Sequence, residues 1–314
     1  MMKISILTLA CFFFSGLAGL IYQVIWVRLL DKVMGSAPFA VATVLTVFMG
    51  GLALGSYWAG RLIDRGMDRR RLLLLYGKLE GLIGLYGLVI PLLLVMLKPL
   101  YAAAYRSLFD SFWPYTTIAF LGCALILIIP TAFMGATLPI LCRFYVEALD
   151  HLGKRTGSLY GLNTVGAAAG AFLTGFYLIE AFGLWGSVGV AAGLNGLVAV
   201  ACFVAGRRNG PLEEKRGRAV KRAEARVKPP AAVEGAPVWP LWIFGVSGFC
   251  AMAYEIVWTR LLGLLLGPTP YSFALVVGTF IVGLAVGALV FGWVADRFGG
   301  DRKSTRLNSS HVSQ

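Results

Sequence analysis

The side chain least suited to its surroundings is Glu255, an acid inside a long apolar run. An ionisable group in a membrane-spanning segment is costly and therefore a candidate functional residue. It stands in the motif Tyr254-Glu255-Ile-Val-Trp258-Thr-Arg260, whose Tyr254 and Trp258 share one helix face. A carboxylate beside aromatic rings suits an ammonium group, because a desolvated cation–π contact is worth about 2 kcal/mol. The motif predicts a site for a cationic ligand centred on Glu255.

A second copy of this motif lies near the N-terminus, where the uncharged Gln23 replaces the acid. The two copies therefore predict an asymmetric site. The alternative is an aromatic belt whose arginines extend to the outer interface. The candidate ligand-lining residues are Tyr22, Gln23, Trp26, Arg28, Tyr254, Glu255, Trp258 and Arg260.

Both motifs belong to an internal repeat, since residues 15–65 match residues 247–297 without a gap and are identical at 19 of 51 positions. An even number of predicted spans separates the copies, so both have the same orientation, as in parallel-repeat transporters. Each copy ends in a turn with an adjacent acid and base, a contact that rocking of the halves could make or break. The alternative is an interfacial turn whose arginine follows the positive-inside rule. The candidate gating residues are Gly60, Asp64, Arg65, Gly292, Asp296 and Arg297.

The composition requires these motifs to lie in membrane helices. Of 314 residues, 58% are hydrophobic and 14% are charged, and the mean hydropathy is +0.78. This predicts an all-α, polytopic membrane protein. The parallel repeat predicts that its helices form an MFS-like (major facilitator) bundle. About eight transmembrane helices are expected, over residues 4–30, 38–62, 72–97, 116–146, 157–181, 185–205, 240–266 and 271–295. Residues 99–115 predict an interfacial helix or, alternatively, an outer loop with aromatic belt residues.

The net charge of +13 comes from basic residues between the spans. They favour a multi-pass protein of the inner (plasma) membrane, with the N-terminus and the 206–238 linker in the cytoplasm, and they predict no nucleic-acid partner. The expected organisation is a six-helix bundle over 1–205, a basic linker over 206–238 and the first two helices of a second bundle over 239–302. Residues 303–314 resemble sequencing-adapter read-through, so we expect an artefactual or disordered tail on a truncated chain.

Histidine and cysteine offer little chemistry. The two histidines, His151 and His311, lie far apart, and the five cysteines show no CxxC spacing. We therefore predict no metal site, no cofactor and no catalytic residue. Two further features concern single spans: Glu80 is another acid within the third span, and Pro139 should break the fourth, with Thr137 bonding the freed carbonyls.

Four segments carry a family resemblance: SGLAGLIYQVIWVRLL, FMGATLPIL, LYGLNTVGAAAGAF and SGFCAMAYEIVWTRLLG. Over about residues 10–300 the chain resembles the membrane portion of bacterial fused MFS/spermidine synthase proteins. The resemblance implies polyamine-related transport or membrane anchoring, with an aminopropyltransferase domain following the membrane region. Such a domain would make the whole protein an enzyme, but this chain has no Gly-rich, acid-rich Rossmann half.

Two other functions remain open from the sequence. The repeat favours a stand-alone MFS-type transporter of an unknown small solute, whereas packing motifs alone would suit a structural membrane scaffold. The predicted partners are the lipid bilayer and a polyamine or other small solute.

Overall fold

The computed structural model describes residues 2–35, 37–63, 67–108, 112–145, 152–208, 239–267 and 269–299, and every regular element in these ranges is a helix. This confirms the predicted all-α class. The helices are α1 (Met2–Met34), α2 (Ala37–Ile63), α3 (Arg69–Met96), α4 (Lys98–Ser107), α5 (Phe112–Tyr145), α6 (Leu152–Leu173), the π-helix η2 (Thr174–Leu178), α7 (Ile179–Arg208), α9 (Trp239–Leu266) and α10 (Pro270–Gly299).

Seven helical stretches in the described residues are long and apolar enough to cross a membrane. The longest covers Gly157–Arg207, and its 51 residues far exceed the roughly 20 that one crossing needs. Gly183 interrupts it with φ 64° and ψ −174°, a conformation open to glycine. The break divides the stretch as the sequence predicted for spans 157–181 and 185–205.

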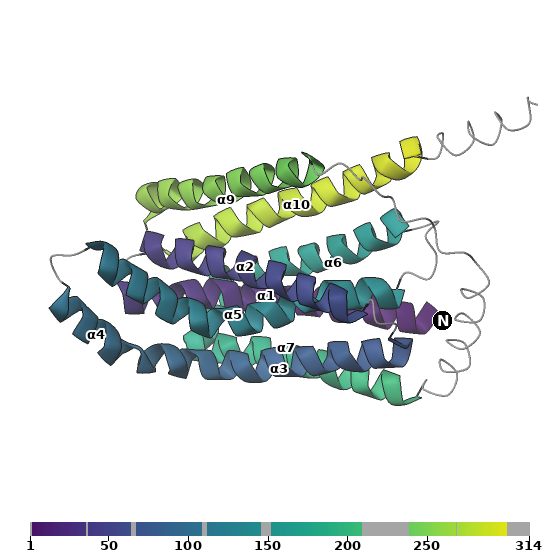
Figure 1. The fold of residues 1–314 in the computed structure, drawn as a ribbon, viewed down its shortest axis with the longest axis horizontal. Helices are drawn as coiled ribbons and strands as arrows, with labels where there is room; N and C mark the ends of the chain where they lie inside the picture. The colour runs from purple at the N-terminus through teal and green to yellow at the C-terminus, as the bar shows by residue number, and fades with distance from the viewer. Residues whose placement is uncertain are drawn as a thin grey trace, which may run out of the picture.

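Helix α1 lies at the centre of the bundle and contacts α2, α3, α6 and α7. Helices α3 and α7 pack together on one side of it, and α2 packs against α5. On the other side, α10 packs on α6 and η2, with α9 outermost (Figure 1). The second repeat copy therefore joins the bundle mainly through α10.

Glycines let the backbones of α2 and α5 approach closely. A Cβ added to Gly51 would overlap the Thr131 side chain, and one added to Gly55 would overlap the Ala132 carbonyl. From the opposite helix, a Cβ on Gly135 would overlap the backbone of Leu52. The contact is thus made by backbone and small side chains, as is typical of membrane helix pairs.

The expected break at Pro139 was wrong, because α5 continues to Tyr145. Proline removes the hydrogen bond to the carbonyl four residues earlier, which here belongs to Gly135. The hydroxyl of Ser56 on α2 donates to that carbonyl at 2.8 Å. Thr137 instead bonds the carbonyl of Met134 at 2.6 Å. The neighbouring helix therefore satisfies the freed group and keeps α5 intact.

The segment after α3 forms a short helix rather than a loop. Helix α4 lies at the end of the bundle opposite the N-terminus (Figure 1) and packs on α5. Its Tyr101 is buried, and the Tyr101 hydroxyl donates to the carbonyl of Ala119 at 3.0 Å. This buried aromatic side chain thus anchors α4 to the bundle.

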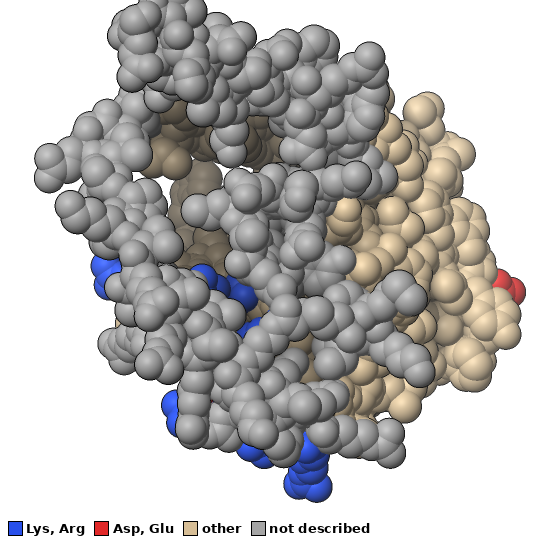
Figure 2. Space-filling model, turned by 90° about the vertical axis from the view of Figure 1, so that its right-hand side faces the viewer, with Lys and Arg blue, Asp and Glu red and all other residues tan. Residues whose placement is uncertain are grey.

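Basic side chains gather at the end that carries the N-terminus. Figure 2 views this end, and the Lys and Arg side chains visible there lie on its left and lower sides. Helix α2 has Arg61 in its last turn, α3 begins at Arg69, α5 has Arg143 in its last turn and α7 ends at Arg208. Residues 209–238 and 303–314 lie outside the described residues, so the linker and the tail stay predictions.

We expect Gly55→Ala to destabilise the protein, because the new Cβ would overlap the backbone of Ala132. Overpacking of this kind costs about 2 kcal/mol. The control is Gly50→Ala on the same helix, where a Cβ meets nothing within 4 Å. Thermal unfolding of the detergent-purified variants measures both. Equal melting temperatures for the two variants would contradict the close contact between α2 and α5.

Candidate functional site

A cavity of about 300 Å³ lies where the end of α1, the start of α2, the end of α9 and the start of α10 meet. Its wall is mostly apolar, from side chains such as Val41, Ile256 and Phe273. The polar side chains that line it are Arg28, Asp31, Thr259, Arg260, Thr269 and Ser272. A small, largely apolar hollow with a few convergent polar groups is typical of a ligand site.

The cavity lies between equivalent parts of the two repeat copies. Residues of the first copy and their counterparts 232 positions later both contribute to its wall. Four such pairs line it: Val27 with Thr259, Arg28 with Arg260, Asp31 with Gly263, and Val41 with Phe273. The repeat therefore builds the cavity from both copies.

Equivalent glycines form the two turns beside the cavity. Gly35 follows α1 with φ 68°, and its counterpart Gly267 follows α9 with φ 82°. Glycine takes such left-handed conformations at little cost. After Gly267, the Thr269 hydroxyl oxygen accepts a hydrogen bond from the backbone N–H of Ser272 at 3.3 Å, as the N-cap of α10. The hydroxyl of Ser272 donates to the Gly267 carbonyl at 3.0 Å.

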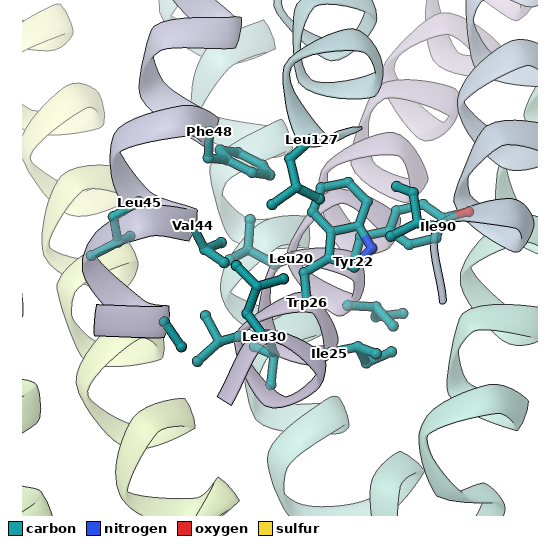
Figure 3. Close-up of a cluster of buried hydrophobic side chains, with 14 of the residues drawn as sticks. Leu20, Tyr22, Ile25, Trp26, Leu30, Val44, Leu45, Phe48, Ile90 and Leu127 are labelled. Carbon is teal, nitrogen blue, oxygen red and sulfur yellow. The ribbon is translucent and has the colours of Figure 1, made fainter. Parts of the chain in front are cut away.

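The predicted aromatic residues do not lie on this cavity. Tyr22 and Trp26 are fully buried within the first repeat copy, with ring centroids 5.4 Å apart (Figure 3). Their counterparts Tyr254 and Trp258 are 62% and 52% exposed. Trp258 lines a second, apolar hollow of about 570 Å³ between α9 and α10. The structure therefore does not bring the four rings together.

Glu255 and Gln23, the matched central residues of the two motifs, are both buried. Neither lines the 300 Å³ cavity. The backbone carbonyl of Glu255 accepts a hydrogen bond from the Thr259 hydroxyl at 2.7 Å. Of the eight candidate ligand-lining residues, the structure brings Arg28 and Arg260 to one cavity. A role for the other six stays a prediction.

Comparison with protein-family models agrees with this architecture. The model of the Major Facilitator Superfamily matches residues 6–308. The chain belongs to the Major Facilitator Superfamily. Comparisons with curated proteins and with solved structures found no match. The predicted MFS-like membrane bundle is confirmed, whereas fusion to a spermidine synthase and truncation of the chain stay predictions.

As a member of the Major Facilitator Superfamily, the chain is a transporter-like membrane protein. The sequence predicts gating residues in one turn of each repeat copy. Gly60 lies in the last turn of α2, but Asp64 and Arg65 are outside the described residues. Gly292, Asp296 and Arg297 lie within α10, and their side chains are not described. Whether these turns act as gates therefore stays a prediction.

A buried polar centre within this superfamily fold was missed by the sequence analysis. Glu80 of α3 is fully buried and accepts two hydrogen bonds. The Ser15 hydroxyl of α1 donates to one carboxylate oxygen at 2.6 Å, and the Asn195 amide of α7 donates to the other at 2.6 Å. These hydrogen bonds thus connect α1, α3 and α7.

Glycines of α3 allow this contact. A Cβ added to Gly84 would lie 3.1 Å from the Asn195 Cβ, and one added to Gly77 would lie 3.0 Å from the Cys202 Cβ. Helix α7 is therefore close enough for the short Asn195 side chain to reach Glu80. Two polar residues inside predicted spans, Glu80 and Asn195, were the available signal, but nothing in the sequence paired them.

We expect Glu80→Leu and Asn195→Leu each to lower the free energy of unfolding. The sum of the two single effects should exceed the effect of the double variant. Each single change leaves a buried polar partner unsatisfied, at a cost of about 1–3 kcal/mol, whereas the double variant removes both partners. Thermal unfolding of the singles and the double should give a coupling energy above about 1 kcal/mol. Glu80→Leu with Thr174→Val is the control, because Thr174 bonds the carbonyl of Gly170 instead. Additive effects in the first pair would show that the polar centre does not stabilise the bundle.

Proposed function

We propose that this chain moves a small solute across the membrane, with the solute binding in the cavity between the repeat copies. The observation that supports this is the lining of the cavity by equivalent residues of both copies, including Arg28 and Arg260. In parallel-repeat transporters the site lies between repeat units, and motion of one unit against the other exposes it alternately to each side. A purely structural scaffold would not need a hollow into which charged side chains of both copies converge.

Filling the cavity should stop transport without unfolding the protein. Thr259→Trp places an indole into the cavity, so uptake of the transported solute should fall at least tenfold. Leu265→Trp is the matched control, because Leu265 is on the same helix, is 81% exposed and does not line the cavity. The measurement is uptake into proteoliposomes from a panel of labelled carboxylates, polyamines and sugars. If Thr259→Trp takes up a panel solute as fast as Leu265→Trp does, the cavity is not the transport site.

We also propose an orientation for the bundle in the inner membrane. The ends of α2, α5 and α7 and the start of α3 place basic residues at the end that carries the N-terminus. Because cytoplasmic connections are enriched in Lys and Arg, this end would face the cytoplasm. The cavity of Arg28 and Arg260 would then lie toward the outer face, at the ends of α1 and α9.

A polyamine is a second candidate solute, favoured by the resemblance of four segments to fused MFS/spermidine synthase proteins. Its candidate partner is Glu255, which is 4% exposed and does not line the cavity of the two arginines. Spermidine uptake should fall at least tenfold in Glu255→Gln. It should change little in Gln23→Ala, the counterpart, which is equally buried. Normal spermidine uptake by Glu255→Gln would exclude this residue as the polyamine site.

The same resemblance favours a role as the membrane anchor of a cytoplasmic aminopropyltransferase. The coding sequence beyond codon 302 distinguishes the two architectures. An aminopropyltransferase domain in the same reading frame would support the fused enzyme, whereas further membrane spans followed by a stop codon would support a stand-alone transporter.

A further inference from the structure

The charges around the 300 Å³ cavity favour an anion. Two guanidinium groups, from Arg28 and Arg260, line it against one carboxylate, from Asp31. Helices α2 and α10 both begin beside it, where Pro38 of α2 and Thr269 before α10 line the wall. A helix N-terminus carries roughly half a positive charge and a helix C-terminus roughly half a negative charge. Because α1 and α9 end beside the same cavity, the helix ends largely cancel, and the two arginines decide the sign of the charge.

The two arginines are not equivalent, although the repeat places them alike. Arg28 has Asp31 three residues later on the same helix, and the two charges attract each other. The counterpart of Asp31 is Gly263, which brings no carboxylate and leaves open space where a side chain would be. Arg260 therefore lacks the acid that Arg28 has three residues later on its helix. Of the two guanidinium groups in the cavity, that of Arg260 is the better placed to pair with a ligand.

The size and wall of the cavity limit the anion. A volume of about 300 Å³ is at the lower limit of ordinary small-molecule sites. The apolar side chains of Val41, Ile256 and Phe273 suit a compact hydrocarbon body rather than a bare inorganic ion. A guanidinium binds a carboxylate through two parallel hydrogen bonds, which fixes its orientation.

We propose that this cavity binds a small organic carboxylate, whose charged group pairs with Arg260 while its apolar body lies against the wall between the repeat copies. Asp31 neutralises Arg28 and keeps the total charge suited to a monoanion. That this carboxylate is also the transported solute rests on the proposed function. That the carboxylate binds in the cavity does not.

The binding test uses the full chain in lipid nanodiscs, with benzoate, hexanoate and acetate as probes. Benzamide and benzylamine are neutral and cationic probes of similar size to benzoate, and spermidine is a polycation. Isothermal titration should detect at least one carboxylate and none of the other three. The proposal is overturned if none of the three carboxylates binds. It is also overturned if benzylamine or spermidine binds more tightly than the carboxylates and Arg260→Gln does not change that binding.

Two matched pairs of variants locate the site. Arg260→Gln should weaken carboxylate binding at least tenfold, and Arg106→Gln should not, because Arg106 is an exposed basic residue on α4, away from the cavity. Gly263→Asp gives Arg260 the acid that Arg28 already has, so it too should weaken binding at least tenfold. Gly263→Asn, of the same size as aspartate but uncharged, measures the effect of the added volume alone, so Gly263→Asp should weaken binding at least fivefold more than Gly263→Asn does.

The outcomes separate binding from transport. Equal carboxylate affinity in Gly263→Asp and Gly263→Asn would overturn the inference even if Arg260→Gln proved too unstable to measure. Carboxylate binding that depends on Arg260, together with full uptake of every panel solute by Thr259→Trp, would support the site and reject the transport role. Uptake lost in Thr259→Trp without any carboxylate binding would support transport and reject the ligand class.

Discussion

Helices in a bilayer gain little hydrophobic free energy by packing together, because lipid tails are as apolar as leucine, so close contact of small residues has to hold them. Glycines provide such contacts between the helices around α1. A Cβ on Gly166 or Gly170 of α6 would overlap the backbone of Phe13 or Leu17 of α1. Similar contacts join α2 to α5 and α3 to α7. These contacts fix α1, and with it the position of Arg28 near its end.

The sequence predicts the membrane helices well because each crossing of the bilayer needs an apolar run of about 20 residues, which is visible in the sequence. It also predicts separate spans over 157–181 and 185–205, and the break between them needs only the local absence of a Cβ at Gly183. It cannot predict which neighbours a helix acquires. Tyr22 and Tyr254 occupy the same position in one motif, yet the first is fully buried and the second is 62% exposed. Helix α1 contacts α2, α3, α5, α6 and α7, whereas α9 contacts chiefly α10 and α2.

Long-range pairing explains the polar features that sequence reasoning missed or misjudged. Glu80 is bonded by residues 65 and 115 positions away, so no local spacing could reveal its partners. Pro139 looks like a helix breaker in its own segment, but Ser56 from another helix satisfies the carbonyl that it frees. In lipid every backbone polar group must find a partner within the protein, and here the partner comes from tertiary structure.

Repetition gives the cavity two similar walls, so its selectivity has to come from the positions at which the copies differ. The exchange of Asp31 for Gly263 leaves one arginine with a neighbouring acid and the other without. A ligand shifts a conformational equilibrium only by the difference between its affinities for the two states. An anion held by Arg260 of α9 would also contact the wall that α1 and α2 supply, so it would bind an arrangement in which the copies lie close together more tightly than one in which they lie apart.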